Sequence, residues 1–350
     1  LPLDDEDKEK LSELIARDPL ALIEYWSIDP DYDGLTFRSK WQDYRENTEG
    51  TDMTRAVRHF LDLPDIPAEA LKEILATAHR MKREKFEPPQ LFYGMSLAMV
   101  FDKKSTRTRM SFEVAMKQLG GHTIVMSADD MHLTGAESIE DTSKVLSRYV
   151  DAAMFRISSH ETLLEIAKHS SIPIINGLTN HSHPCQIMAD LVTIEEKLGA
   201  LQGKKIAWFG DYNNVARTFA QASKIWDFEL VAAVPADLAP TKSDGIKITQ
   251  DVASAATNAD VIVTDTWVSM GQEGKAIEKF LPFQVNPELM AKAKPGAIFM
   301  HCMPIHRGEE VTDSVLATKA SVIYDEAENR LHAQKAVLAW CLEGTGVKVL

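Results

Sequence analysis

The sequence predicts an α/β protein with two doubly wound domains, each with a central parallel sheet, joined by interdomain helices. Short apolar runs typical of buried strands alternate with segments of helical periodicity along most of the chain. Such alternation indicates parallel sheets, whose crossover connections are usually helices. The pattern occurs on both sides of a possible hinge at 199–203, and 350 residues with 45% apolar content suffice for two cores.

The first half contains four predicted strands, at 96–101, 123–126, 152–157 and 172–177. A helix is expected at 67–85, and another follows residue 109 and stops at Gly120. A third helix, 138–149, begins with a capping pattern in which Asp141 follows Ser138 by three residues. A fourth, 187–198, has Pro184 in its first turn and is expected to cross between the domains.

The second half repeats this organisation. Predicted strands lie at 205–210, 229–235, 261–267, 297–300 and 322–324, followed by a final helix at 331–342. We therefore divide the chain into an extension, 1–50; a first domain, 51–190, completed by a C-terminal helix, 328–350; and a second domain, 191–327.

Composition limits the classes of function. The net charge of −14 argues against a nucleic-acid or membrane-surface role, so an anionic ligand needs a local arginine cluster. Three cysteines without a CxxC pattern favour a reducing cytosol, and no apolar run reaches the ~18 residues of a membrane span. The extension 1–50 is acidic and contains several aromatic residues, and its role is unknown.

The stretch from Ser105 to Arg109 is the main candidate for a ligand site. It lies where a strand ends and a helix begins, so free backbone N–H groups and the positive end of the helix dipole meet there. Three hydroxyl groups and two forked guanidinium groups match phosphate geometry. A plain helix cap with two surface arginines is the alternative, but five polar donors in one turn favour an anion site.

Further polar residues are expected at the same edge of the first sheet, because ligands bind at the carboxyl ends of parallel strands. Arg156 falls at the end of one strand. His183 and Gln186 follow the next strand and lie three residues apart, so both can face one pocket. Each is an ordinary structural residue when taken alone, and their convergence on the Ser105 turn favours a functional role.

A nucleotide-dependent dehydrogenase is an alternative that the second sheet suggests. The GxGxxG fingerprint is missing after Gly210, however, and Tyr212 would crowd a pyrophosphate. Asn213 and Asn214 suit a small polar ligand instead, and Asp265, at a strand end, can hold an ammonium group.

Two residues allow two interpretations each. Cys302 is either a buried apolar residue or part of a site at the end of its strand. Arg330 either starts a helix in solvent or reaches back towards the anion.

Four motifs occur in the order and spacing of the carbamoyltransferases: STRTR at 105–109, HPCQ at 183–186, DTWVSMG at 265–271 and HCMP at 301–304. From about Thr54 to Gly344 the sequence resembles the aspartate/ornithine carbamoyltransferase family, and the loop 269–271 is similar to that of members acting on ornithine. The resemblance implies that domain 51–190 binds carbamoyl phosphate and domain 191–327 binds L-ornithine. It also implies a homotrimer or an assembly of trimers with shared active sites, cytoplasmic, in arginine biosynthesis, without a cofactor or metal ion.

The resemblance also implies roles for individual residues. Catalysis is assigned to Arg107, Arg156, His183, Asp265 and Cys302. Carbamoyl phosphate is assigned to Ser105, Thr106, Arg107, Thr108, Arg156, His183, Gln186, Cys302 and Arg330. Ornithine is assigned to Asn214, Asp265, Ser269 and Met270.

The chemistry agrees with this assignment, because an amine must attack a carbonyl carbon while phosphate leaves. Catalysis then depends on positioning and charge stabilisation, with Arg107 on the phosphate and Arg156 and His183 on the carbonyl. Asp265 and Cys302 can orient the amine and favour its unprotonated form, since an alkyl ammonium of pKa ~10.4 is no nucleophile.

Two departures from the family and two alternatives within it stay open. The extension 1–50 has no recognised counterpart in ordinary members of the family. Asp129 stands where many members carry a glutamine that reaches the neighbouring subunit, although His132 in the same loop matches. Transfer to another amine such as putrescine, and a catalytically silent homologue, are the alternatives.

Overall fold

The computed structural model describes residues 57–86, 88–103, 105–131, 137–241, 245–268 and 277–343, all within one unit of the chain, 55–350. The extension 1–50, His132, Ser269 and Met270 lie outside the described residues. Among the helices of the described ranges, none is long and apolar enough to cross a membrane.

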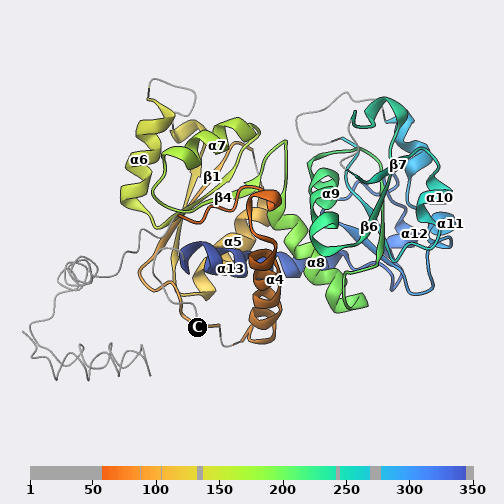
Figure 1. Cartoon of the computed structure of the whole chain (residues 1–350), viewed down its shortest axis with the longest axis horizontal. Helices are drawn as coiled ribbons and strands as arrows, with labels where there is room; N and C mark the ends of the chain where they lie inside the picture. Colours follow the sequence, from red (N-terminus) through yellow and green to blue (C-terminus); the bar gives the residue numbers. More distant parts are fainter. Residues whose placement is uncertain are drawn as a thin grey trace, which may run out of the picture. The chain divides into compact units, whose positions relative to one another are not determined.

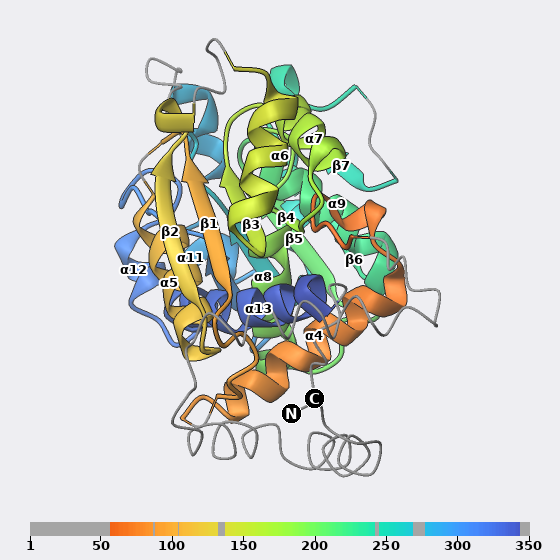
Figure 2. The ribbon, with the colours of Figure 1, turned by 90° about the vertical axis from the view of Figure 1, so that its left-hand side faces the viewer.

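The first sheet, which contains β1 and β4 of Figure 1, has four parallel strands in the order β2-β1-β3-β4, all labelled in Figure 2. The strands are β1 (Ser96–Phe101), β2 (His122–Ser127), β3 (Ala152–Arg156) and β4 (Ile174–Leu178). The helical segments of this half are η1 (Leu63–Asp65), α4 (Ala68–Arg83), α5 (Thr106–Gln118), η2 (Asp129–Met131), α6 (Ile139–Tyr149), α7 (His160–His169) and α8 (Pro184–Leu198).

Alternation along the strands gives this sheet two apolar faces. Ala98 and Val100 of β1 pack in a cluster with α6 and α7, whereas Leu97 and Met99 face a cluster that includes α4, α5 and α8. Figure 2 shows α6 and α7 over one part of the molecule and α4 and α13 crossing below. Both faces are covered, as a parallel sheet requires.

The second sheet has five parallel strands in the order β7-β6-β5-β8-β9. These are β5 (Lys205–Phe209), β6 (Glu229–Ala233), β7 (Lys247–Thr249), β8 (Val261–Thr264) and β9 (Ile298–His301). Its helical segments are α9 (Asn214–Trp226), η3 (Ala236–Leu238), α10 (Val252–Ala256), η4 (Glu278–Phe283), α11 (Pro287–Met290), α12 (Asp313–Leu316) and α13 (Ile323–Glu343). Two covered parallel sheets confirm the predicted fold class.

The predicted strand 322–324 is wrong, because α13 already begins at Ile323. Only a single bridge joins Ser321 to Phe299 of β9, and the N–H of Val322 donates to the carbonyl of Phe299. The apolar side chains of Val322 and Ile323 are buried as expected, but at the entrance of a helix. An apolar run of two or three residues cannot distinguish these states.

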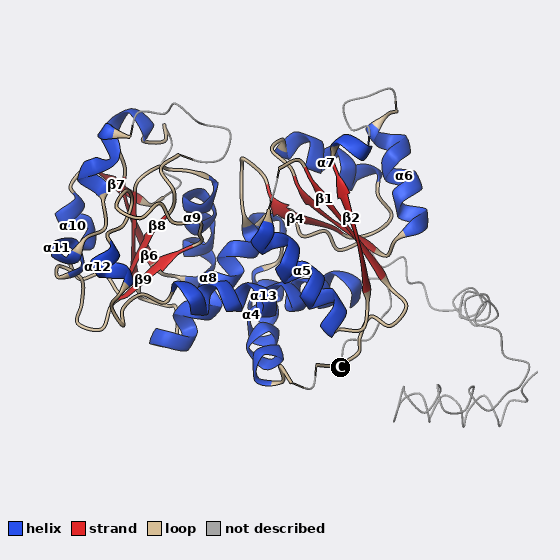
Figure 3. Ribbon diagram, turned by 180° about the vertical axis from the view of Figure 1, so that it is seen from behind, coloured by secondary structure: helices blue, strands red, loops and turns tan. Residues whose placement is uncertain are grey.

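Helix α13 returns from the second sheet to the first. It packs on α8, α4 and α5, and one continuous apolar cluster includes Leu338 of α13, Met99 of the first sheet and Trp208 of the second. Figure 3 shows α8 and α13 between the two red sheets. We retain the proposed boundaries near 190 and 327, which fall within α8 and α13.

We expect Leu338→Ala to lower the free energy of unfolding by about 2–5 kcal/mol, because it leaves a cavity in a fully buried site. Tyr324→Ala, at an exposed position of the same helix, is the matched control and should change it by about 0.5 kcal/mol or less. Urea denaturation followed by circular dichroism measures both, and equal effects of the two variants would contradict the docking of α13.

Candidate active site

The turn after β1 opens α5 with Ser105 in the N-cap position. Ser138 and Ser159 cap α6 and α7 with their side chains, but the Ser105 side chain makes no such bond to α5 within the described residues. The N-terminal N–H groups of α5 therefore have no side-chain cap there. This leaves both the hydroxyl group and the helix N-terminus available to an anion.

Thr108 joins three distant parts of the chain. Its buried Oγ1 accepts a hydrogen bond of 2.7 Å from Nη1 of Arg156, at the end of β3, and one of 2.9 Å from Nη2 of Arg330, in α13. Three residues predicted to bind carbamoyl phosphate are thus brought together.

The positive charges in this group oppose one another. Burial, followed by the Arg330 and Arg107 charges, lowers the pKa of Arg156 to about 10. Burial also lowers the pKa of Arg330. The Nε of Arg330 is buried without a hydrogen-bond partner in the described part of the chain. An anion would satisfy these donors and offset the repulsion.

His183 lies in the same environment. Burial, with the charges of Arg330 and Arg156, lowers its pKa well below the usual value. The imidazole is therefore neutral at pH 7, and one nitrogen can donate a hydrogen bond. Its backbone N–H donates to Oγ1 of Thr218 in α9, at 3.0 Å, which ties the start of α8 to the second domain.

Gln186 is held by two buried carboxyl groups that the sequence analysis missed. Its Nε2 donates to Asp190, at 2.8 Å, and to Glu326, at 3.2 Å. Burial raises the pKa of both carboxyl groups, to about 7 for Asp190, and the Asp190 charge raises that of Glu326 further. The two groups also bond each other and therefore share a proton. Since Nε2 is fixed in this way, Gln186 presents Oε1, which has no partner among the described residues, as an acceptor.

The second domain contributes Asp265 at the end of β8. One carboxylate oxygen accepts from Nδ2 of Asn213, at 2.7 Å, and the other from the Thr266 N–H, at 2.8 Å. The same Oδ1 accepts a 3.1 Å hydrogen bond from Sγ of Cys302, which follows β9. Burial and the Asp265 charge raise the pKa of Cys302 well above its usual value, so the sulfur is a thiol.

These two groups of residues lie near each other, because Cys302 is within electrostatic range of both Arg156 and Arg330. The arrangement places guanidinium donors beside a carboxylate and a thiol. It can hold an anion at one end and an ammonium group at the other.

Asn214, predicted to bind ornithine, occupies a different position from its neighbour Asn213. Its Nδ2 donates to the carbonyl of Thr179, at 2.7 Å, and its Oδ1 accepts from Val215. Asn214 thus fastens α9 to the loop after β4, while Asn213 contacts Asp265. Sequence adjacency alone could not assign these two contacts.

Three further residues named in the sequence analysis are exposed to solvent. Asp129 is exposed in η2, and Thr106 and Arg109 are exposed in α5. Asp190 follows Gln186 by one helical turn, a spacing that could have predicted their contact. Glu326 carried no comparable signal, because it is 140 residues from Gln186.

Comparison with known protein families divides the chain as the two sheets do. Residues 58–196 match the carbamoyl-P binding domain of aspartate/ornithine carbamoyltransferase, and residues 202–341 match the Asp/Orn binding domain.

Individual relatives cover most of the chain. An ornithine carbamoyltransferase of Brucella suis is 51% identical over 306 residues, which span 83% of this chain and 97% of the relative. The solved ornithine carbamoyltransferase from Pyrococcus furiosus is 47% identical with a TM-score of 0.77, covering 81% and 96% of the two chains. A mitochondrial ornithine carbamoyltransferase from Coccidioides immitis is 34% identical with a TM-score of 0.77, covering 84% and 100%.

We expect Cys302 to react with iodoacetamide more slowly than a free cysteine at pH 8, because the thiolate is the nucleophile and its formation is disfavoured here. Asp265→Asn removes the adjacent negative charge, lowers the pKa and should accelerate alkylation about three- to tenfold. Glu288→Gln, an exposed change in α11, is the control.

Mass spectrometry identifies the alkylated residue, since Cys185 and Cys341 are buried in the folded protein. An Asp265→Asn variant that is alkylated no faster than the parent would show that Asp265 does not act on the thiol.

Proposed function

The chain belongs to the aspartate/ornithine carbamoyltransferase family, and we propose that it transfers the carbamoyl group of carbamoyl phosphate to the δ-amine of L-ornithine. The products are L-citrulline and phosphate. The observation that carries this proposal is the contact of Arg156 and Arg330 with Thr108 at the start of α5, opposite the Asp265–Cys302 pair. The relatives named above supply the choice of ornithine.

The phosphate end is assigned to residues 105–108. Ser105, Thr106 and the N-terminus of α5 donate hydrogen bonds, and Arg107 offsets the charge of the phosphate. As the C–O bond to phosphate breaks, the electron pair leaves with the phosphate oxygen. Arg107 stabilises that developing charge.

The carbamoyl group is assigned to Arg156, His183, Arg330 and Gln186. The amine forms a C–N bond to the carbonyl carbon, and the carbonyl oxygen becomes an oxyanion. Arg156 and neutral His183 donate to that oxygen, and the buried setting strengthens these contacts. The fixed Oε1 of Gln186 accepts from the carbamoyl NH₂, which sets its orientation.

The ornithine end is assigned to Asp265, Asn214, Ser269 and Met270, the last two lying outside the described residues. An isolated carboxylate would keep the δ-amine protonated. Here the nearby guanidinium charges oppose an ammonium ion, so the bound δ-ammonium group passes one proton to the Asp265 carboxylate and attacks with the freed lone pair. After attack the nitrogen gives a second proton to the departing phosphate, and the oxyanion electrons re-form the carbonyl. The Cys302 thiol, bonded to the same carboxylate, keeps it oriented.

Alternative amine acceptors differ from ornithine in the groups that the loop 269–271 would contact, and the relatives named above favour ornithine over putrescine. The retained arginines, His183 and Cys302 argue against a silent homologue. We place the reaction in arginine biosynthesis in the cytoplasm, where Cys185, Cys302 and Cys341 remain thiols.

A homotrimer with shared active sites is part of the proposal. The edge strand β2 exposes Ile124, and the adjoining helix α5 exposes Met110 and Val114 one turn apart (Figure 2). Exposed apolar side chains on an edge strand and its neighbouring helix suit a subunit contact. Asp129 follows directly after β2, in the segment predicted to reach the neighbouring subunit.

We expect citrulline formation with ornithine to fall about 100-fold or more in Arg107→Ala, because the charge on the departing phosphate loses its partner. Arg148→Ala is the matched control, since Arg148 is an exposed arginine in the last turn of α6. A colorimetric citrulline assay with ornithine, putrescine, acetylornithine and aspartate in parallel measures both.

Two outcomes would contradict the proposal. Turnover with another amine and none with ornithine would overturn the substrate. Equal activity of Arg107→Ala and the parent would overturn the placement of the phosphate.

We expect the double variant Val114→Glu, Ile124→Glu to be monomeric, because each new charge would be buried at the contact between subunits. Since the active sites are proposed to be shared, its activity should fall as well. Leu281→Glu, at an exposed apolar position of the second domain, should leave the trimer intact. Light scattering coupled to size-exclusion chromatography measures the mass, and a monomeric parent protein would overturn the assembly.

A further inference from the structure

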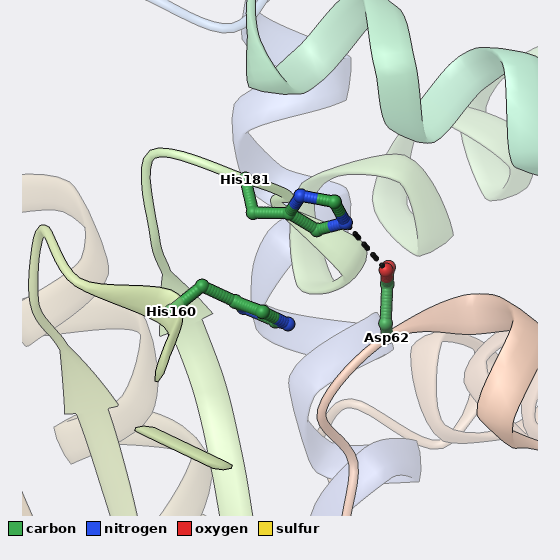
Figure 4. A group of neighbouring side chains, drawn as sticks. All are labelled: Asp62, His160 and His181. Atoms are coloured by element: carbon green, nitrogen blue, oxygen red, sulfur yellow. Dashed lines mark ion pairs between the residues drawn. The ribbon is translucent and has the colours of Figure 1, made fainter. Parts of the chain in front are cut away.

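Two histidines and an aspartate outside the proposed active site converge on one point. Asp62 precedes η1, His160 begins α7, and His181 lies in the loop between β4 and α8. Figure 4 shows both imidazole rings extending towards the Asp62 carboxylate. One potential ligand atom from each of the three lies within 4.8 Å of the others.

The hydrogen bonds of this cluster leave potential metal-ligand atoms facing its centre. Nδ1 of His160 bonds Oγ1 of Thr179, at 3.0 Å, so Nε2 remains as the ligand atom. Nε2 of His181 lies 3.4 Å from Oδ2 of Asp62. A hydrogen bond that fixes one nitrogen of a histidine while the other faces a ligand is a common arrangement around bound metal ions.

The carboxylate is held in place as well. Asp62 is buried, its Oδ1 accepts the N–H of Leu63, at 3.0 Å, and its Oδ2 accepts from Nε2 of Gln221, at 2.8 Å. Outer contacts of this kind orient a ligating carboxylate. The rings of His160 and His181 lie with their centroids 4.6 Å apart and their planes tilted by 32°, so both imidazoles are at the same side of the carboxylate (Figure 4).

The surroundings admit a cation from solvent. His160 and His181 line an open cavity of about 530 Å³ that also includes Glu161. Asp65 lies close enough to interact electrostatically with both histidines. Arg217 lines the cavity too, but its guanidinium donates to the backbone carbonyls of Asn180 and His181.

We propose that Asp62, His160 and His181 form a binding site for a divalent transition-metal ion of the Zn²⁺, Co²⁺ or Ni²⁺ class, with solvent completing the coordination. Two imidazoles and one carboxylate suit these ions rather than Mg²⁺ or Ca²⁺. The site is separate from the residues assigned to carbamoyl transfer. It is stabilising, because it ties the segment before η1 to α7 and to the loop that leads to His183.

Titration of the metal-free protein with Co²⁺, followed by absorption spectroscopy and calorimetry, tests the site. The expected result is one Co²⁺ per chain without a sulfur-to-cobalt charge-transfer band. Affinity should fall about tenfold or more in His160→Ala and in His181→Ala. His122→Ala, an exposed histidine of β2, is the matched control and should bind as the parent does.

A second cluster, Asp265, His301 and Cys302, could also bind the ion, and Cys302→Ser distinguishes the two. Binding lost in Cys302→Ser, or a sulfur charge-transfer band on the tight-binding ion, would overturn the proposal. Unchanged affinity in both histidine variants would overturn it as well. Circular dichroism confirms that the variants fold, and Co²⁺ should raise the melting temperature of the parent but not of His181→Ala.

Discussion

The hydrogen bonds from Arg156 and Arg330 to Thr108 are the interaction on which the rest of the structure depends. They bring two guanidinium groups together in a buried place, where like charges repel strongly. The neighbouring carboxyl groups of Asp190 and Glu326 share a proton and so supply less negative charge than two carboxylates would. The folded protein therefore carries excess positive charge at this point, and the proposed anionic substrate relieves it.

This requirement explains much of the architecture. Thr108 comes from α5, Arg156 from β3 and Arg330 from α13, so the cluster exists only when the last helix has docked on the first sheet. The loop after β4 then bonds α9 through Asn214 and Thr218, which holds the Asp265–Cys302 pair opposite the arginines. The arginines come from the first domain and its returning helix, Asp265 comes from the second domain, and we propose that the reaction takes place where these residues meet.

All strands of the two sheets except β7 could be predicted because they contain runs of four or more apolar or β-branched residues, although β2 is only partly buried. The run at 322–324 was too short to separate a strand from the start of a helix, and β7, with its partly exposed residues, carried no pattern. Arg156 and the Ser105 turn could be placed by the strand-end rule. The one-turn spacing of Gln186 and Asp190 could have indicated their contact. The contacts of Glu326 and Asn213 could not be predicted, because they join residues far apart in the sequence. The histidine cluster at Asp62 had no sequence signal, since its three members come from separate segments.

Helix α13 has a consequence for the order in which the protein is made. The first domain precedes the second in the chain, yet one apolar face of its sheet is completed by residues 323–343. During synthesis on the ribosome, α4, α5 and α8 can cover part of that face early, but its coverage stays incomplete until almost the whole chain has emerged. The second sheet, whose strands are contiguous in sequence, can form before the first is sealed. Newly made chains therefore present an open apolar surface on their older half, which is the kind of surface that chaperones bind.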